Sequence, residues 1–315
     1  MSGSTATVLM RPYRNRVHRR PGSDLALLAV GVAAVSTAGP LIREADAPAL
    51  AIAAWRNLLA TAFLCVVVAV AHRRAVAGLD GRQRRLIGVA GLCLAAHFAT
   101  WVPSLELTSV ASSVALVCTQ PVWAALISRS RGEPVSRRVW TGIGLALGGV
   151  VLLTGVDLTV SGRALWGDVL ALAGGALAAA YVIVGAEVRR DVANPVYTWG
   201  CYGVAGVLLA TVAIGSGQAM SGYDAHTWWV LVAITVGPQL LGHSVFNRVL
   251  PSVGPTVVSV AILLEVLGSV LLAWWWFDEV PPAAAFPAGA LLLAGLTVVA
   301  TDRPEVEIDD QVPVL

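Results

Sequence analysis

The sequence predicts an all-α membrane protein whose ten transmembrane helices form two inverted five-helix repeats. Three observations support this prediction. First, 57% of the residues are hydrophobic and 13% are charged, whereas soluble globular proteins carry about 25% charged residues. Second, residues 86–155 match residues 232–301 at a constant shift of 146 positions. Third, nearly all arginines lie in every second break between apolar segments, which is typical of a multi-pass membrane protein.

The repeat places residues of the same type at equivalent positions in the two halves. His97 corresponds to His243, and Gly149 corresponds to Gly295. The matched stretches are almost wholly apolar, so the repeated unit is a set of membrane helices and not a soluble repeat. Duplicated helical halves around a shared interface are the usual construction of secondary transporters.

The first half contains five apolar segments, each close to the roughly 20 residues that a bilayer core about 30 Å thick requires. They are residues 24–42, 48–71, 86–106, 109–128 and 139–157. The charged run 43–46 ends the first segment, and the turn sequence 78–81 follows the second. Pro103 and Glu106 separate the third segment from the fourth, a division that also depends on the repeat itself.

The second half contains five further segments of similar length. They are residues 165–186, 195–215, 227–249, 254–276 and 283–301. The glycine-containing turn 215–217 ends one segment, and the two prolines at 281–282 precede the last. Prolines and a glycine within 251–255 divide the eighth segment from the ninth.

The chain has no lysine, so the distribution of arginine predicts the orientation in the membrane. With the N-terminus inside, eighteen arginines are cytoplasmic, Arg43 and Arg163 are external, and Arg56 lies within a helix. Both termini are therefore expected to be cytoplasmic, in a multi-pass protein of the cell inner (plasma) membrane. Because each half has an odd number of helices, the second half enters the membrane from the opposite face.

These boundaries predict four parts of the chain. A basic cytoplasmic arm spans residues 1–23, the first repeat spans 24–157, and the second repeat spans 163–301. The acidic residues of 302–315 predict a solvated cytoplasmic tail.

A series of short motifs occurs in the first half and again in the second. They are Ser112–Ala115, Gln120–Trp123, Arg131–Pro134 and the glycine-rich stretch Gly142–Gly155, followed by Ser259–Ala261, Leu264–Val266 and Phe277–Glu279. In order and spacing they resemble the EamA-type domain, the repeated module of the drug/metabolite transporter superfamily. The resemblance covers residues 24–301. It implies a ten-helix carrier with two EamA domains that moves small metabolites, often amino acids or related compounds and often outward.

Glu265 lies eleven residues into segment 254–276, close to the predicted bilayer midplane. A charged side chain at this depth costs about 2.5–3.5 kcal/mol on insertion scales. Burial therefore favours the protonated acid unless a cation pairs with it. Glu265 is a candidate ligand for a substrate amine or a candidate proton-coupling group. The alternative is a protonated glutamate that hydrogen-bonds a neighbouring helix.

His97 and His243 lie near the middle of corresponding helices, so they face equivalent places about the predicted pseudo-two-fold axis. A histidine at this depth can change charge near neutral pH or hydrogen-bond across helices. The two histidines are candidates for lining a central cavity, with packing as the alternative. Neither belongs to an HxxH or HExxH pattern, so the sequence predicts no metal site and no cofactor.

Two prolines interrupt predicted helices. Pro121 follows Gln120 at the centre of the fourth segment, and Pro238 lies within the eighth. Proline removes a backbone donor, which is tolerated where a helix borders a cavity. We therefore expect a hinge or a substrate notch at Pro121 and a hinge at Pro238, with static kinks as the alternative, and Gln120 is a candidate substrate-binding residue. Trp101 and Trp123 lie deep enough to stack on an aromatic or cationic substrate, and the alternative is packing or lipid contact.

Three further residues are expected to be structural. Arg56 lies about eight residues into the second segment and is expected to snorkel outward or to pair with Asp46 or Glu106. Gly144 and Gly148 have GxxxG spacing, which predicts close helix packing inside the bundle or at a dimer contact.

These features together predict a secondary active transporter, an exporter of a small metabolite, that works by alternating access between the inverted halves. The sequence contains no Walker A pattern, so ATP-driven transport by this chain alone is not expected. The alternatives are a membrane-embedded enzyme and a non-transporting receptor or scaffold. We favour neither, because an enzyme needs a nucleophile and base or a metal set at membrane depth, which is not predicted, and a scaffold predicts no polar cavity around His97 and Glu265. The expected partners are a small-molecule substrate and the lipid bilayer, with no nucleic acid, and a homodimer is left open.

Overall fold

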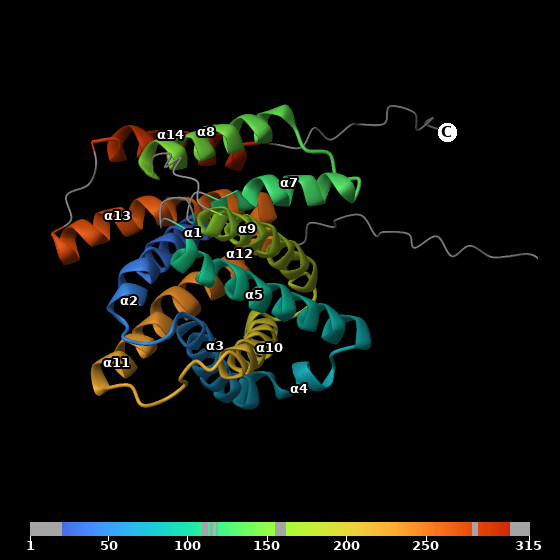
Figure 1. Cartoon of the computed structure of the whole chain (residues 1–315). Coiled ribbons are helices and arrows are strands. Elements are labelled where there is room, and N and C mark those ends of the chain that lie inside the picture. Colours follow the sequence, from blue (N-terminus) through green and yellow to red (C-terminus); the bar gives the residue numbers. More distant parts are fainter. Residues whose placement is uncertain are drawn as a thin grey trace, which may run out of the picture.

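The computed structural model describes residues 21–108, 113, 116–117, 119–154, 162–278 and 283–302. The predicted basic arm and acidic tail lie almost wholly outside these residues. Every element of the described part is a helix (Figure 1). The helices are α1 Pro21–Ser36, α2 Ala38–Glu44, α3 Ala49–Val67, η1 Val68–His72, α4 Arg73–Ala77, α5 Gly81–Leu107, α7 Gln120–Ser130, α8 Arg137–Thr154, α9 Gly162–Val188, α10 Asn194–Gly215, α11 Ala225–Ile234, η2 Thr235–His243, α12 Ser244–Ile262, α13 Leu264–Phe277 and α14 Ala285–Ala300.

Six runs of helix in the described part are long and apolar enough to cross a membrane. They are Ser23–Ile42, Ala49–Ala77, Gly81–Ser104, Gly162–Val188, Asn194–Gly215 and Ala225–Ile262. Two shorter apolar helices, Leu264–Trp276 and Phe286–Ala300, follow near the end of the described chain. A bilayer core about 30 Å thick needs about 20 residues of helix, so these runs make the chain a multi-pass membrane protein.

The run from Ala225 to Ile262 is interrupted at Gly254. Its 38 residues would extend about 57 Å as one straight helix, which is far more than the bilayer core requires. Gly254 has φ 81° and ψ 161°, a conformation that a side chain disfavours, and Pro251 and Pro255 flank it. The chain therefore breaks at the position where the sequence predicts a division between two segments.

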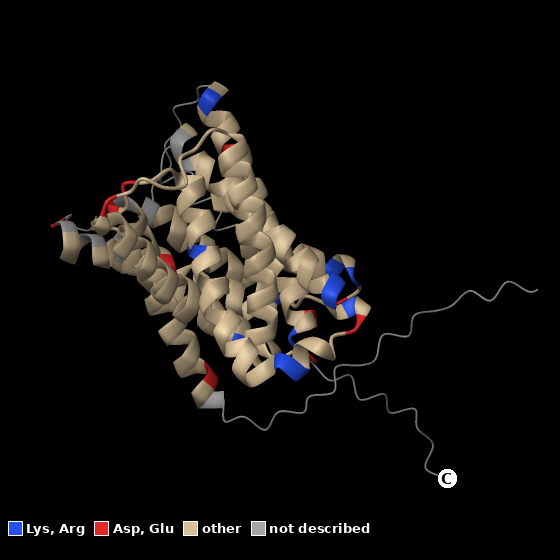
Figure 2. Cartoon of the chain, turned by 90° about the horizontal axis from the view of Figure 1, so that it is seen from below, with Lys and Arg blue, Asp and Glu red and all other residues tan. Residues whose placement is uncertain are grey.

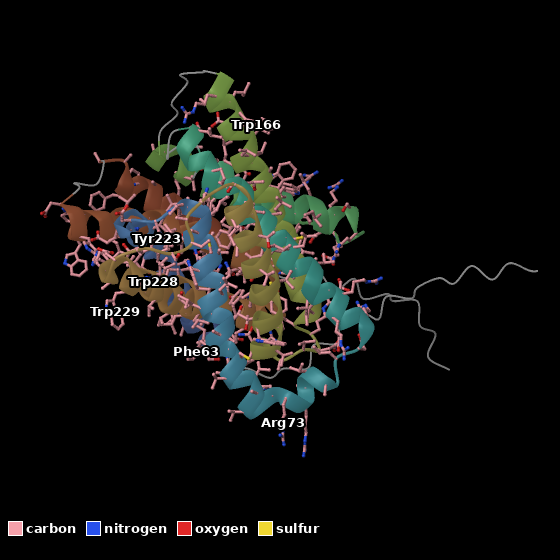
Figure 3. The ribbon with its side chains drawn as sticks, turned by 60° about the horizontal axis from the view of Figure 1, so that its bottom comes forward. Phe63, Arg73, Trp166, Tyr223, Trp228 and Trp229 are labelled. Carbon is pink, nitrogen blue, oxygen red and sulfur yellow. The ribbon has the colours of Figure 1, made fainter. Side chains whose placement is uncertain are left out.

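Apolar side chains fill the centre of the bundle and also cover much of its outside. Tyr197, Tyr202 and Leu209 of α10 are fully buried against the neighbouring helices. Phe63 of α3, by contrast, is 58% exposed and points away from the bundle (Figure 3). An outward apolar side chain is stable in a lipid environment, which is as apolar as the protein core.

Helices α8 and α14 pack side by side through glycine (Figure 1). A Cβ atom added at Gly295 would lie 2.5 Å from the carbonyl oxygen of Gly142, and one at Gly149 would lie 2.7 Å from that of Ala288. The repeat shift of 146 converts the first contact into the second, because Gly142 corresponds to Ala288 and Gly149 to Gly295. Reciprocal contacts of this kind are what a two-fold relation between the halves requires.

The GxxxG pair of α8 does not make this contact. Gly144 and Gly148 are exposed, and an added Cβ atom at either would meet no atom within 4 Å. The expectation that they pack inside the bundle is therefore wrong for this chain. A dimer contact at these two glycines stays a prediction.

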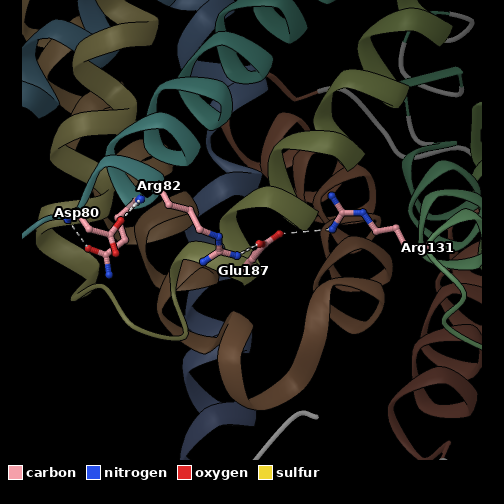
Figure 4. A network of polar contacts seen from close by, with 5 residues as sticks. Asp80, Arg82, Arg131 and Glu187 are labelled. Carbon is pink, nitrogen blue, oxygen red and sulfur yellow. Dashed lines mark hydrogen bonds and ion pairs between the residues drawn. The ribbon is translucent and has the colours of Figure 1, made fainter. Parts of the chain in front are cut away.

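One end of the bundle carries most of the described arginines (Figure 2). At this end the Glu187 carboxylate of α9 is bonded by Arg82 of α5 and lies 3.7 Å from Nη1 of Arg131, just beyond α7 (Figure 4). Exposed ion pairs contribute only about 0–1 kcal/mol to stability. The network therefore adds little to the stability of the fold, and its main effect is to hold three helix ends together.

Asp224 caps the N-terminus of α11, and its Oδ1 accepts a hydrogen bond of 2.8 Å from the backbone N–H of Thr227. Hydrogen bonds from the Thr227 hydroxyl and backbone N–H hold the pKa of Asp224 below its ordinary value. A pKa lowered by folding gives stability that is present above the unfolded pKa and lost as the pH falls through the folded pKa. We expect D224A to lower the melting temperature at pH 7 and to differ less from the unsubstituted protein below about pH 4.

Tryptophan fluorescence during heating of the detergent-solubilised protein measures this difference. The exposed Asp46 offers a matched control, since D46A removes a carboxylate of the same exposed kind. A D224A deficit that stays constant from pH 7 to pH 3 would contradict the capping role.

Candidate functional site

A chain of buried polar groups surrounds Arg56 in α3. The Arg56 side chain is 2% exposed, and its Nε donates a hydrogen bond of 2.7 Å to Oε1 of Gln239. Nε2 of Gln239 donates to Oδ1 of Asn57 at 3.0 Å, and Nδ2 of Asn57 donates to the backbone carbonyl of Ala53. Arg56 neither snorkels outward nor pairs with Asp46, which is exposed, and the Glu106 side chain lies outside the described residues. An amide from a distant helix supplies a partner that the sequence did not indicate, and the pairing of Arg56 with Glu106 stays a prediction.

The irregular helix η2 brings Gln239 to Arg56. This segment, Thr235–His243, is a π-helix, in which each backbone N–H bonds the carbonyl five residues earlier, and Pro238 lies within it. Such wide turns commonly mark functional positions, and proline favours them because it lacks a backbone donor. The Tyr202 hydroxyl of α10 lies 3.4 Å from the Gln239 carbonyl and 3.1 Å from the Ser244 hydroxyl. Pro238 thus lies in a local distortion of the helix, and its role as a moving hinge stays a prediction.

A cavity of about 270 Å³ adjoins Arg56. Phe98 and Trp101 of α5 and the apolar residues around Ala49 and Ile52 of α3 form its other walls. The Arg56 guanidinium carbon lies 5.1 Å from the centre of the Phe98 ring, which is within the range of a cation–π interaction. Within the described part of the chain, Nη2 of Arg56 is buried and has no hydrogen-bond partner.

His97 and Trp101 lie one helical turn apart on α5 and stack on each other. Their ring centres are 5.7 Å apart with planes inclined by 13°. Nδ1 of His97 lies 2.9 Å from the carbonyl oxygen of Gly174 in α9, and since a carbonyl can only accept, Nδ1 carries the proton. His97 therefore supports the cavity wall from behind Trp101. The buried indole nitrogen of Trp101 has no partner among the described residues.

Arg56 also lies within electrostatic reach of three ionisable residues that the sequence predicted. Its charge interacts with Glu265 at the start of α13, with His97 and with His243 at the end of η2. These residues come from distant parts of the sequence, and none of the three is among the residues that line the cavity beside Arg56. Charges in a low-dielectric interior interact over longer distances than charges in water, so Arg56 is the group that these interactions share.

Gln120 and Trp123 lie elsewhere. Nε2 of Gln120 donates a hydrogen bond of 3.0 Å to the Ser259 hydroxyl of α12. Nε1 of Trp123 donates to the Thr119 hydroxyl at 3.1 Å, and its ring packs among apolar side chains of α7 and α9. Neither lines the cavity beside Arg56. Pro121 occupies the first turn of α7, a position where proline costs no hydrogen bond.

Sequence reasoning missed Arg56, Asn57 and Gln239 as members of this site. Two signals could have found them. Arg56 and Asn57 are adjacent polar residues in an otherwise apolar segment, and Gln239 directly follows Pro238. Polar residues at membrane depth almost always face the interior of a bundle.

The sequence profile of the EamA-like transporter family matches residues 22–155 and again residues 165–301. A relative from Archaeoglobus fulgidus, described as an uncharacterized transporter, is 24% identical over 196 residues, which are 61% of this chain and 68% of the relative. A protein of known crystal structure superposes with a TM-score of 0.75 at 17% identity, over 89% of this chain and 96% of its own. This last similarity concerns the fold alone.

Proposed function

The chain belongs to the EamA-like transporter family, and from this premise we propose that it is a secondary active exporter of a small metabolite that carries a carboxylate, such as an amino acid. The observation that carries the proposal is the buried Nη2 of Arg56, which lacks a partner among the described residues beside a cavity of about 270 Å³. Buried charged groups are costly unless they are paired. A substrate carboxylate would supply the missing partner.

The surroundings of Arg56 favour a zwitterion over a simple acid. Glu265 does not line the cavity but interacts electrostatically with Arg56, and we propose that it binds the substrate amine during transport; Phe98 and Trp101 of the cavity wall provide apolar contact for a side chain. The cavity is slightly smaller than the roughly 300–1,000 Å³ that drug-sized ligands occupy. This size fits a metabolite with few non-hydrogen atoms.

We propose that transport proceeds by alternating access between two inverted repeats, residues 24–157 and 163–301, with ten membrane spans in total and both termini cytoplasmic. The reciprocal contacts of α8 with α14 support the inversion. Two polar contacts join the two repeats. Glu187 with Arg82 joins α9 to α5 at one face, and Glu44 with His226, at 3.2 Å, joins α2 to α11. Each contact joins a helix of the first repeat to a helix of the second.

Reconstitution into proteoliposomes tests the proposal. Vesicles loaded with labelled amino acids and related carboxylates are expected to release at least one of them faster when an imposed pH gradient or an external substrate drives exchange. Protein-free vesicles measure the leak. If neither gradient moves any candidate metabolite faster than the leak, the proposed function is wrong.

The role of Glu265 gives a separate prediction. E265Q removes the ionisable acid and keeps the size of the side chain, so we expect transport of an amine-bearing substrate to fall about tenfold or more while the protein still folds. The reason is that a charge-assisted hydrogen bond contributes about 1.5–3 kcal/mol. The measurement is initial efflux rate at equal reconstituted protein. Glu133 is exposed, so E133Q provides a control, and near-normal transport by E265Q would remove Glu265 from the mechanism.

A further inference from the structure

A second cavity, a groove of about 430 Å³, lies between α4, α5 and α10 at the arginine-rich end of the bundle. Its lining is apolar except at one position. The apolar surface comes from Val76, Leu79, Ile87 and Trp199, and the charge comes from Arg84. The groove is separate from the cavity beside Arg56, because the two share no lining residue.

The chain's own packing leaves this groove open. An added Cβ atom at Gly88, on the groove wall, would meet nothing within 4 Å, so the space in front of α5 is free. At Gly200 an added Cβ atom would lie 2.7 Å from the Ile87 side chain, so α5 and α10 are in close contact beneath. The groove therefore has a closed floor and an open side.

Exposed arginines lie on α4 and in the first turns of α5, and one of them, Arg84, lines the groove. Arg73, Arg74, Arg84 and Arg85 are all exposed, and none of them takes part in the ion pairs found within the part of the chain that the structure describes. Figure 3 shows Arg73 extending away from the bundle. Clusters of arginine next to a membrane helix attract anionic lipid headgroups.

Nearby carboxylates are already engaged. Asp80 accepts a hydrogen bond of 2.7 Å from the backbone N–H of Gln83 and so caps α5. Glu187 is bonded by Arg82 and lies near Arg131 (Figure 4). The ligand site at the groove therefore carries a net positive charge.

The surface next to the groove is apolar and exposed. Val70 of η1 is 81% exposed, Leu92 of α5 is 55% exposed and Val207 of α10 is 59% exposed. Exposed apolar side chains on a membrane helix contact lipid chains. The groove thus lies where the lipid-facing surface meets the arginines, and a ligand that satisfies both must have an apolar chain and an anionic head.

We propose that this groove binds an anionic phospholipid, with an acyl chain against Ile87, Gly88 and Trp199 and the phosphate at Arg84. Arginine binds phosphate oxygens through two parallel N–H donors. A bound lipid would fix the short helix α4 against α5 and α10. The proposal is independent of the transported substrate.

Fluorescence quenching of Trp199 tests the site. The full-length protein is placed in nanodiscs that contain phosphatidylglycerol with brominated chains, or phosphatidylcholine with the same chains, at increasing mole fraction. The quenching that is lost in W199F measures the lipid bound in the groove. We expect half-maximal quenching of this part at a severalfold lower mole fraction of phosphatidylglycerol than of phosphatidylcholine.

Two variants separate charge from shape. R84Q is expected to remove the preference for phosphatidylglycerol, and G88L is expected to fill the groove and reduce quenching by both lipids. Arg84 is exposed, so R84Q tests the proposal even if G88L fails to fold. The control R129Q removes an exposed arginine from the end of α7 and should leave the preference unchanged.

Equal quenching by the two lipids in the unsubstituted protein would overturn the proposal, as would an R84Q preference equal to that of R129Q. Added inorganic phosphate at millimolar concentration is expected not to reverse the quenching. Reversal would indicate an anion site that does not recognise the lipid chain, and would also overturn it.

Discussion

Replacing Arg56 by glutamine is expected to reduce transport of a carboxylate substrate by about 10- to 100-fold. Charge-assisted hydrogen bonds contribute about 1.5–3 kcal/mol, and each 1.4 kcal/mol corresponds to a factor of ten. R56Q removes the Nη2 donor that faces no partner among the described residues and also the bond from Nε to Gln239. Initial rates in proteoliposomes with equal amounts of folded protein measure the effect.

R56K and R129Q define the cause of this loss. R56K keeps the positive charge but lacks the planar pair of donors, so we expect partial transport. R129Q changes an exposed arginine and should transport normally. A rate for R56Q within twofold of the unsubstituted protein would show that Arg56 does not bind substrate.

A substrate analogue keeps the Arg56 prediction testable if R56Q does not fold. The unsubstituted protein should transport the uncharged amide of its substrate as poorly as R56Q transports the acid, because both changes remove the same ion pair. Equal rates for acid and amide would count against a carboxylate site at Arg56.

Replacing Gly295 by leucine is expected to separate α14 from α8 and to destabilise the protein. The first added carbon would lie 2.5 Å from the Gly142 carbonyl oxygen and 2.8 Å from the Ala146 side chain, and backbone atoms at this distance cannot move aside cheaply. Overpacking of a closely packed contact costs about 1–3 kcal/mol or more. The measurement is the melting temperature in detergent together with the folded yield.

Two other glycines give matched comparisons. G149L is expected to cause a similar loss, because Gly149 makes the equivalent contact with Ala288. G148L, one residue earlier on α8, enters open space and should change the melting temperature little. Equal melting temperatures for G295L and G148L would contradict the packing described for α8 and α14.

Part of the candidate site could be predicted from the sequence because ionisable groups at membrane depth are rare and costly. That argument selected Glu265, His97 and His243, which lie within electrostatic reach of Arg56 but do not line the cavity beside it. It gave Arg56 itself a structural role, because the partner Gln239 is 183 residues away in sequence. The roles proposed for these residues in transport await the experiments above.

The length of the hydrophobic segments, their repetition and the composition by themselves determined that the chain is a multi-pass helical membrane protein. The turn residues of the sequence also placed the helix break at Gly254. These properties are local to a segment. The tertiary structure alone decided which face of each helix is inside, as Gly149 and Gly148 show: one packs against α14 and the other is exposed. The physical reason is that lipid and protein core are equally apolar, so an apolar sequence does not distinguish the side of a helix that packs from the side that meets the bilayer.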